Sequence, residues 1–209
     1  MFHYAQYRHT APQAIRQLVD RFPLALVTTQ VNGQWHSTQV PLFLNEHNTE
    51  LFGHVDAAND QFEGANGLSV QVVFAGPNAY IPPEAYTSRQ LPTWNYLSVH
   101  MTGTLALVSD TQQKIDILSE TARRLDGTPG AFRIHPSDER IHRWIGSIRG
   151  LTIRILDMEG RFKLSQDKSP EDIRAAALHF SRVVSEQTTP DLLLSFCRAG
   201  SPSTHTAMP

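Results

Sequence analysis

The stretch TWNYLSVHMTGT (residues 93–104) decides the fold class, because its side chains alternate between apolar and polar from Leu97 onward. The apolar set is Leu97, Val99 and Met101, and the polar set is Ser98, His100, Thr102 and Thr104. This period of two is typical of a strand with one face in a core. The polar face carries hydroxyls and an imidazole where a plain solvent face would usually carry Lys and Glu. The stretch therefore predicts a half-buried strand with an unusual polar face.

The entrance to this strand places two aromatic side chains, Trp94 and Tyr96, around the carboxamide of Asn95. Such a group suits a planar ligand with polar edges better than a peptide or a metal. The alternative is that both aromatic side chains cap the core, which is the commoner use of such residues.

The other patterns predict hairpins and peripheral helices. Asn32-Gly33 lies between the apolar runs 24–29 and 35–44 and is the strongest short signal for a hairpin. Further strands are expected at 50–55, 68–75, 97–108, 150–156 and 161–165, with a strand end at 76–78 and a turn at 157–160. Helices are expected from Thr10 to Phe22, after Asp110, over 137–145 and from Ser169, and a short helix or helical turn is expected over 57–64. No regular βαβ alternation is present, so the sequence predicts a mainly β, α+β fold: a closed antiparallel barrel with peripheral helices.

Composition excludes several classes of protein. The chain has 209 residues and a formal charge of −2 from 18 basic and 20 acidic side chains, so no overall field attracts nucleic acid. Its single cysteine, Cys197, fits a reducing compartment. No apolar run of membrane-spanning length and no secretory signal is present, which predicts a cytoplasmic protein away from the membrane. We expect one domain over 1–187, followed by a short helix and a disordered tail over 188–209.

The sequence contains no motif that decides an enzymatic chemistry. A Gly-x-Gly-x-x-Gly or Gly-Lys-Ser/Thr phosphate loop and a Gly-x-Ser-x-Gly elbow are absent. Ten histidines are scattered without companion ligands at metal-binding spacing, so no metal is expected. The segment around His54, Asn59 and Gln61 has the donors of an anion site at a helix start, but taken alone it fits an ordinary capped turn better.

Four segments taken together resemble the PaiB family of FMN-binding negative transcriptional regulators. They are Gly53-His54 through Asn59 with Gln61, then 74–81, then Pro92 to Tyr96 with Val99-His100, and finally Lys163 to Gln166 with Ser169, Glu171 and Asp172. The resemblance covers residues 1–185. It implies the flavin-binding split-barrel fold and a homodimer with two FMN sites at the subunit interface.

The resemblance also implies a set of cofactor-binding residues. The phosphate would lie near His54, Asn59 and Gln61, and the ring near Trp94, Asn95 and Tyr96. Lys163, Ser165 and Gln166 would approach from the last barrel strand. Relatives with well-established FMN binding often carry Arg or Lys in the phosphate loop. This chain has none between Gly53 and Gly64, so Lys163 is the clear cation.

The family implies a dimeric, flavin-responsive regulator, with no catalytic residues assigned. The net charge of this chain and its lack of a helix-turn-helix segment do not support direct contact with DNA. One alternative is a flavin-dependent oxidoreductase, in which His54 and His100 would handle protons. Another is a haem-binding split-barrel protein with a histidine as axial ligand.

Overall fold

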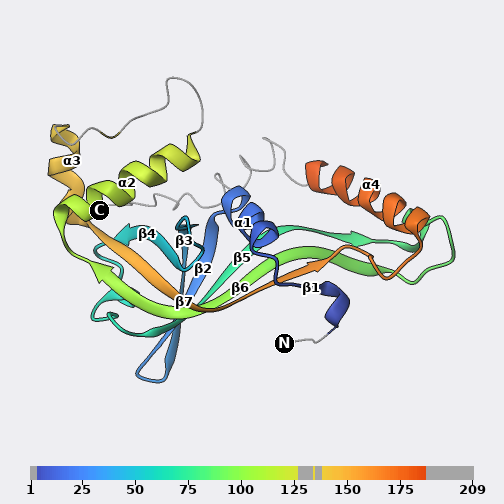
Figure 1. Ribbon diagram of the computed structural model, residues 1–209, viewed down its shortest axis with the longest axis horizontal. Coiled ribbons are helices and arrows are strands. Elements are labelled where there is room, and N and C mark those ends of the chain that lie inside the picture. Colours follow the sequence, from blue (N-terminus) through green and yellow to red (C-terminus); the bar gives the residue numbers. More distant parts are fainter. Residues whose placement is uncertain (1–3, 127–133, 135–137, 187–209) are drawn as a thin grey trace, which may run out of the picture. The chain divides into compact units, whose positions relative to one another are not determined.

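The computed structural model describes residues 4–126, 134 and 138–186 (Figure 1). The predicted tail at 188–209 therefore lies outside the described residues, as does Cys197. The described residues form two compact units. We call the first the barrel unit, which lies within 1–76 and 96–163, and the second the α4 unit, which lies within 77–95 and 164–186.

The barrel unit is built from antiparallel strands. The sheet order is β1-β7-β4-β3-β2-β5-β6, and a further pairing of β7 with β6 closes it. The strands are β1 (Arg8–His9), β2 (Leu24–Val31), β3 (Gln34–Leu44), β4 (Glu50–Asp56), β5 (Ser69–Ile81), β6 (Thr93–Val108) and β7 (Ile148–Lys163). This arrangement confirms the predicted α+β fold with an antiparallel barrel and peripheral helices.

The barrel interior holds the apolar face of each strand. Val27, Leu42, Leu51 and Met101 are at most 1% exposed. Ile15, Leu18 and Val19 of helix α1 (Pro12–Arg21) join the same cluster. The alternation from Leu97 onward is confirmed, because Val99 and Met101 of β6 are buried in this core. The sequence thus placed the inner face of β6 correctly.

Helix α2 (Thr111–Leu125) begins where predicted, since the Asp110 carboxylate accepts a 2.8 Å hydrogen bond from the Gln113 amide. The expected cap at Thr10 is wrong: α1 begins after Ala11, without a side-chain cap. Helix α3 spans Glu139–Trp144, and the short helix or helical turn expected over 57–64 is a single 3₁₀ turn at Asp60–Phe62. Other 3₁₀ turns lie at Ala5–Tyr7, Pro83–Ala85 and Ile145–Ser147.

The β2–β3 hairpin turns at Asn32 and Gly33, as the sequence predicted. Both residues have positive φ angles, 51° and 80°. A two-residue turn of this kind matches the right-handed twist of the flanking strands. The register then pairs Thr28 with Ser37 and Gln30 with Trp35.

Two strands are longer than the sequence predicted. The turn expected at 157–160 is absent, because these residues pair with β6: Asp157 lies opposite Thr102 and Glu159 opposite His100. The β6–β7 pairing contains one register shift, between Thr102 and Gly103. Strand β5 continues through the expected end at 76–78. Its pairing with β2 stops at Phe74, so the missing amide hydrogen of Pro77 breaks no bond to β2.

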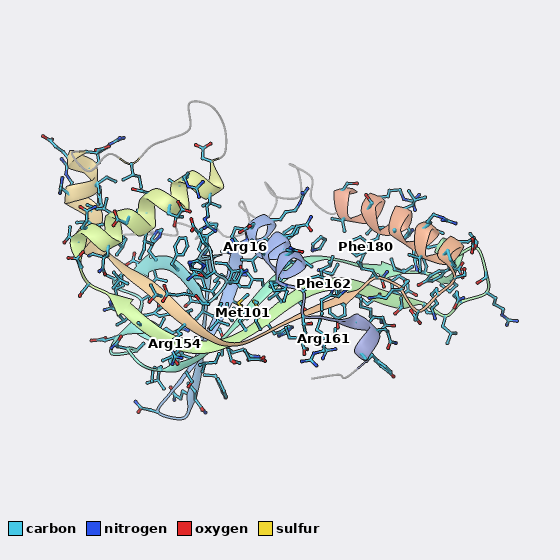
Figure 2. All side chains as sticks on the ribbon, viewed as in Figure 1. Arg16, Met101, Arg154, Arg161, Phe162 and Phe180 are labelled. Carbon is cyan, nitrogen blue, oxygen red and sulfur yellow. The ribbon has the colours of Figure 1, made fainter. Side chains whose placement is uncertain are left out.

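The α4 unit has its own small core. Helix α4 (Pro170–Glu186) begins as predicted, with the Ser169 hydroxyl accepting a hydrogen bond from the Asp172 amide. Ala79, Ile81 and Tyr86 pack against Ala176 of this helix. Phe180, labelled in Figure 2, extends the same cluster. None of the helices among the described residues is long and apolar enough to cross a membrane.

Candidate functional site

A polar cluster in the barrel unit contains two of the predicted site residues, Asn59 and Gln61. The Thr38 hydroxyl donates a 2.6 Å hydrogen bond to Oε1 of Gln61 and accepts one from Nδ2 of Asn59. Nε2 of Gln61 donates to the carbonyls of Val27 and His36, at 3.0 and 3.3 Å. Gln61 is only 4% exposed, so its side chain holds the loop at 57–61 against strands β2 and β3.

Four of the five backbone amides of this loop, those of Ala57, Ala58, Asn59 and Gln61, are already engaged. The amide of Ala58 donates to the Asp56 carboxylate, and the amide of Gln61 donates to Oδ1 of Asn59. The amides of Ala57 and Asn59 donate to backbone carbonyls. The loop is therefore an ordered turn rather than a nest of free amide donors. A phosphate here would depend on side chains.

Arg149 is a side chain that could bind a phosphate at this loop, and the sequence analysis did not assign it to the site. Arg149 lies opposite Val55 in the β4–β7 pairing, and its Nη1 donates a 3.1 Å hydrogen bond to the Asn59 carbonyl. It is half-buried, and the structure gives it no carboxylate partner among the described residues. The fold thus supplies the cation that the loop sequence lacks.

His54 lies on the opposite face of the sheet from this cluster. Gly53 and Val55 point into the core, so His54 points outward between them. Thr38 shares the core face of β3 with Val40 and Leu42. Burial lowers the pKa of His54 and its Nδ1 has no hydrogen-bond partner among the described residues. The structure brings Asn59 and Gln61 together and separates His54 from them.

The outer face of β6 and β7 carries a second polar group. His100 Nε2 lies 3.1 Å from the Ser98 hydroxyl, and Glu159 lies opposite His100. Burial lowers the pKa of His100, Glu159 opposes that effect, and Arg161 adds to it. Arg161 is 5% exposed and pairs with Glu159 at 2.7 Å. Figure 2 shows Arg161 and Phe162 on opposite sides of β7, as expected for consecutive strand residues.

Tyr96 and Lys163 are brought together as cross-strand neighbours at the ends of the barrel unit's β6 and β7 segments. Tyr96 is 36% exposed. The Lys163 ammonium lies 6.0 Å from the centre of the Tyr7 ring, in a cation–π arrangement. These two predicted site residues therefore lie side by side.

In the α4 unit, Asn95 and Ser165 contact each other. Nδ2 of Asn95 donates a 3.0 Å hydrogen bond to the Ser165 hydroxyl, which also lies 2.9 Å from the Tyr86 hydroxyl. Asn95 and Ser165 are each 1% exposed. Ser165 has a φ of 62°, a conformation that is costly for a residue other than glycine. The arrangement suits a fixed turn more than a surface that touches a ligand.

Trp94 points away from Asn95, because successive strand side chains alternate. Trp94 is 51% exposed, its indole N–H donates a 3.1 Å hydrogen bond to Asn78, and its ring lies 6.2 Å from that of Tyr80. Gln166 lies in the turn before α4, where its Oε1 accepts from the Leu164 amide. Of the predicted site residues in the α4 unit, Asn95 and Ser165 are thus buried and Trp94 is exposed.

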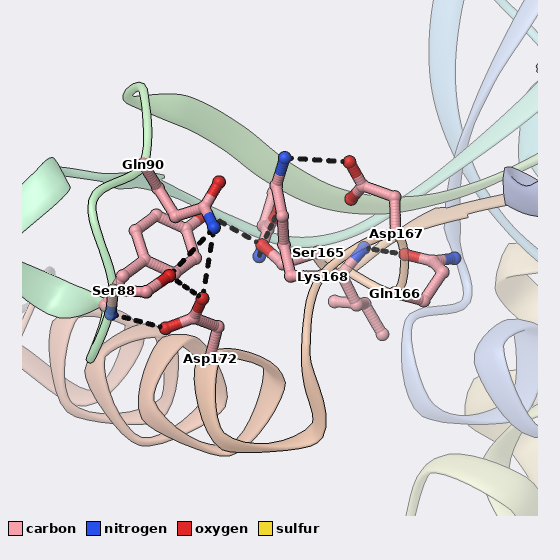
Figure 3. A network of polar contacts seen from close by, with 10 residues as sticks. Ser88, Gln90, Ser165, Gln166, Asp167, Lys168 and Asp172 are labelled. Carbon is pink, nitrogen blue, oxygen red and sulfur yellow. Dashed lines mark hydrogen bonds and ion pairs between the residues drawn. The ribbon is translucent and has the colours of Figure 1, made fainter.

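Asp172 organises the loop before β6, a role that the sequence analysis missed. Its carboxylate accepts hydrogen bonds from the amides of Thr87 and Ser88, from both hydroxyls and from the Gln90 amide group (Figure 3). The hydrogen bond from Ser88 and those from Thr87 hold its pKa well below the usual range. The sequence contained the hydroxyls and the acid, but no local pattern links residues 85 positions apart.

Comparison with known proteins decides the family. Residues 1–157 match the family described as "Putative FMN-binding domain". The chain belongs to this FMN-binding domain family. The resemblance drawn from the sequence is thereby confirmed, and FMN is the cofactor that the family supports.

Individual relatives agree with this family. The chain is 26% identical over 172 residues to protease synthase and sporulation protein PAI 2 of Bacillus subtilis (strain 168), with 79% of this chain and 82% of the relative covered. The FAD and heme binding protein of Mycobacterium smegmatis superposes with a TM-score of 0.62 at 18% identity, covering 81% of this chain and 80% of the other. The flavocytochrome Anf3 of Azotobacter vinelandii superposes with a TM-score of 0.63 at 16% identity, covering 84% of this chain and 78% of the other. These two structures show that the fold is shared.

The donor set at the 57–61 loop fits the phosphate of FMN. Arg149 offers a cation without a carboxylate partner in the described part of the chain and donates to the Asn59 backbone carbonyl, while the Asn59 amide group donates to the Thr38 hydroxyl. The Asp56 carboxylate accepts the Ala58 amide but keeps its negative charge, so it opposes an anion at this loop. Binding at this site would therefore depend on one half-buried cation and neutral donors.

Proposed function

We propose that this protein binds FMN as a homodimer and acts as a flavin-responsive negative regulator of transcription. The observation that carries the proposal is Arg149 beside Asn59 in a chain of the FMN-binding family. Arg149 and Asn59 would hold the phosphate, and Gln61 with Thr38 would fix the loop. When bound, FMN would supply a redox-sensitive ring, and the protein's residues would bind and orient it.

The remaining predicted cofactor residues complete the proposal. Trp94, Asn95 and Tyr96 would lie near the ring, together with Lys163. Ser165 and Gln166 would shape the turn that precedes α4. His54 remains a proposed contributor from the other face of β4. A homodimer would bring a second copy of these groups to each site, as the family resemblance implies.

An FMN titration tests the binding half of this proposal. Purified protein is titrated with FMN while flavin fluorescence and the visible spectrum are followed, and sedimentation velocity gives the mass of the complex. The expected result is saturable binding of one FMN per chain to a dimer. A chain that leaves the flavin spectrum unchanged at micromolar concentrations would overturn it.

The regulatory half needs its own experiment. Transcripts are compared between cells with and without the gene, and between wild type and a strain whose protein carries Arg149→Gln. Derepression of the same genes in both strains is expected if flavin binding drives regulation. Derepression in the deletion alone would separate regulation from flavin, and no change in either would reject the regulator.

A flavin-dependent oxidoreductase is the second candidate. It is favoured by the likeness to a flavocytochrome and by His100, whose pKa burial lowers and whose Nε2 lies 3.1 Å from the Ser98 hydroxyl. Anaerobic mixing of the FMN-loaded protein with NADH or NADPH tests it. Bleaching of the flavin band within seconds would favour this candidate over the regulator, and a stable band would count against it. A Soret band in freshly purified protein would instead favour haem binding.

A further inference from the structure

The outer face of strands β2, β3 and β5 is exposed and carries no charge. On β2, Leu24 and Leu26 are 51% and 40% exposed, whereas the alternating residues Ala25 and Val27 are fully buried. The outward positions are the even-numbered ones from 24 to 30, the odd-numbered ones of β3 from 35 to 41, and the odd-numbered ones of β5 from 69 to 75. None of these positions holds Asp, Glu, Lys or Arg. A charge-free exposed sheet face is typical of the centre of a protein interface.

The two ends of this face differ in shape. At one end a mainly apolar groove of about 360 Å³ is lined by Leu24, Pro41, Ala75, Leu125 and Phe22, with Pro23 and Gln39. At the other end Trp35 is 69% exposed beside the Asn32–Gly33 turn. The pairing of β2 with β5 stops at Thr29, so the hairpin tip runs beyond β5 (Figure 1). The face therefore has an apolar recess at one end and a projecting indole at the other.

A two-fold axis through the middle of this face would exchange its two ends, so that the recess of one copy meets the indole of the other. Leu24 and Gln30 are six residues apart on β2, or about 20 Å along the strand. Gln30 pairs with Trp35 across the hairpin. If two copies face each other with β2 antiparallel, an axis near Val27 and Thr28 places each recess against the partner's hairpin tip. A symmetric dimer makes such a contact twice.

We propose that this face is the dimer interface and that Trp35 of each protomer inserts into the Leu24–Pro41–Ala75 recess of its partner. The inference rests on the homodimer in the proposed function and specifies its contact. A second copy fits better than a nucleic acid, because the face offers no cation for phosphate groups. The same hairpin carries Thr38 on its inner face, where Thr38 bonds to Asn59 and Gln61, so the interface and the proposed phosphate site share one hairpin.

Removal of the indole tests the contact. Sedimentation equilibrium over a concentration series gives the dimer dissociation constant for wild type, Trp35→Ala and the control Trp144→Ala. Trp144 is similarly exposed, at 64%, but lies on α3. A buried interfacial tryptophan costs about 2 kcal/mol or more on truncation, a roughly 30-fold change, and the symmetric pair makes it close to a thousand-fold. The control is expected to leave the constant within about twofold.

A charge pair tests the orientation. Leu24→Lys alone places a lysine in each recess and is expected to dissociate the dimer. Adding Gln30→Glu in the same chain restores it, because each lysine then faces the partner's glutamate. Within one protomer the two positions are too far apart to pair, so rescue requires antiparallel packing of this face. Circular dichroism verifies that every variant is folded.

The outcomes separate this inference from the function on which it rests. A wild-type chain that remains monomeric with and without FMN overturns both the homodimer and this interface. A wild-type dimer that Trp35→Ala leaves intact overturns the interface alone. A dimer that Leu24→Lys dissociates and that added Gln30→Glu does not restore overturns the antiparallel orientation and with it the proposed insertion.

Discussion

The Gln61 side chain offers a direct test of how the loop at 57–61 is held. Replacement by leucine removes three hydrogen bonds: those to the Val27 and His36 carbonyls and the one from Thr38. At about 1 kcal/mol each, the loss is about 3 kcal/mol. Leucine returns about 1 kcal/mol through added apolar burial at a position only 4% exposed. The free energy of unfolding should therefore fall by about 2 kcal/mol in Gln61→Leu.

A double-mutant cycle gives the assay its control. Thr38→Val removes the hydroxyl that donates to Gln61, and the double variant should cost about 1 kcal/mol less than the sum of the single changes. Urea unfolding followed by circular dichroism measures all four proteins. Gln13→Leu, on the exposed face of α1, should stay within about 0.5 kcal/mol of wild type. Additive effects, or a Gln61→Leu protein as stable as this control, would refute the reasoning.

Two further predictions follow from single contacts. Arg149→Gln should weaken FMN binding by about 10- to 100-fold through loss of a charge-assisted contact, while Arg154→Gln, an exposed arginine on the same strand, should leave affinity within about twofold; a fluorescence titration measures both. Asp172→Asn should speed hydrogen exchange at the Thr87 and Ser88 amides by at least about tenfold, and equal exchange in both proteins would remove the role given to the carboxylate. Because the pKa of Asp172 is depressed in the folded chain, protons bind the unfolded chain first as the pH falls. Its stabilisation is thus present above about pH 4 and is lost below it, which exchange measured over a pH series checks.

Local patterns predicted what depends on neighbours in sequence. The Asn32–Gly33 turn, the inner face of β6 and the Asp110 cap each follow from a few consecutive residues, and each is present. The turn expected at 157–160 is absent because pairing with a strand that is distant in sequence decides the conformation there. Asp157 and Glu159 have poor strand propensity, but their cross-strand pairing with Thr102 and His100 outweighs it.

The candidate site likewise combines residues that are close in sequence with one that only strand pairing brings near. Asn59 and Gln61 could be proposed from the sequence because they share one loop. Arg149 could not, since only the antiparallel pairing of Val55 with Arg149 brings that cation to the loop. Strand alternation was sufficient to separate Trp94 from Asn95, but the resemblance grouped them by position in the chain.

The span between Thr87 and Asp172 also has a consequence for synthesis on the ribosome. The loop at 87–90 emerges 85 residues before the carboxylate that fastens it. At about 10 residues per second, the nascent loop stays unfastened for roughly eight seconds, and longer while the exit tunnel still covers α4. During that interval the amides and hydroxyls of Thr87 and Ser88 lack the carboxylate that accepts their hydrogen bonds in the folded chain, and the loop is open to proteases and chaperones. The last helix of the described chain therefore sets the time at which this early loop becomes resistant to cleavage.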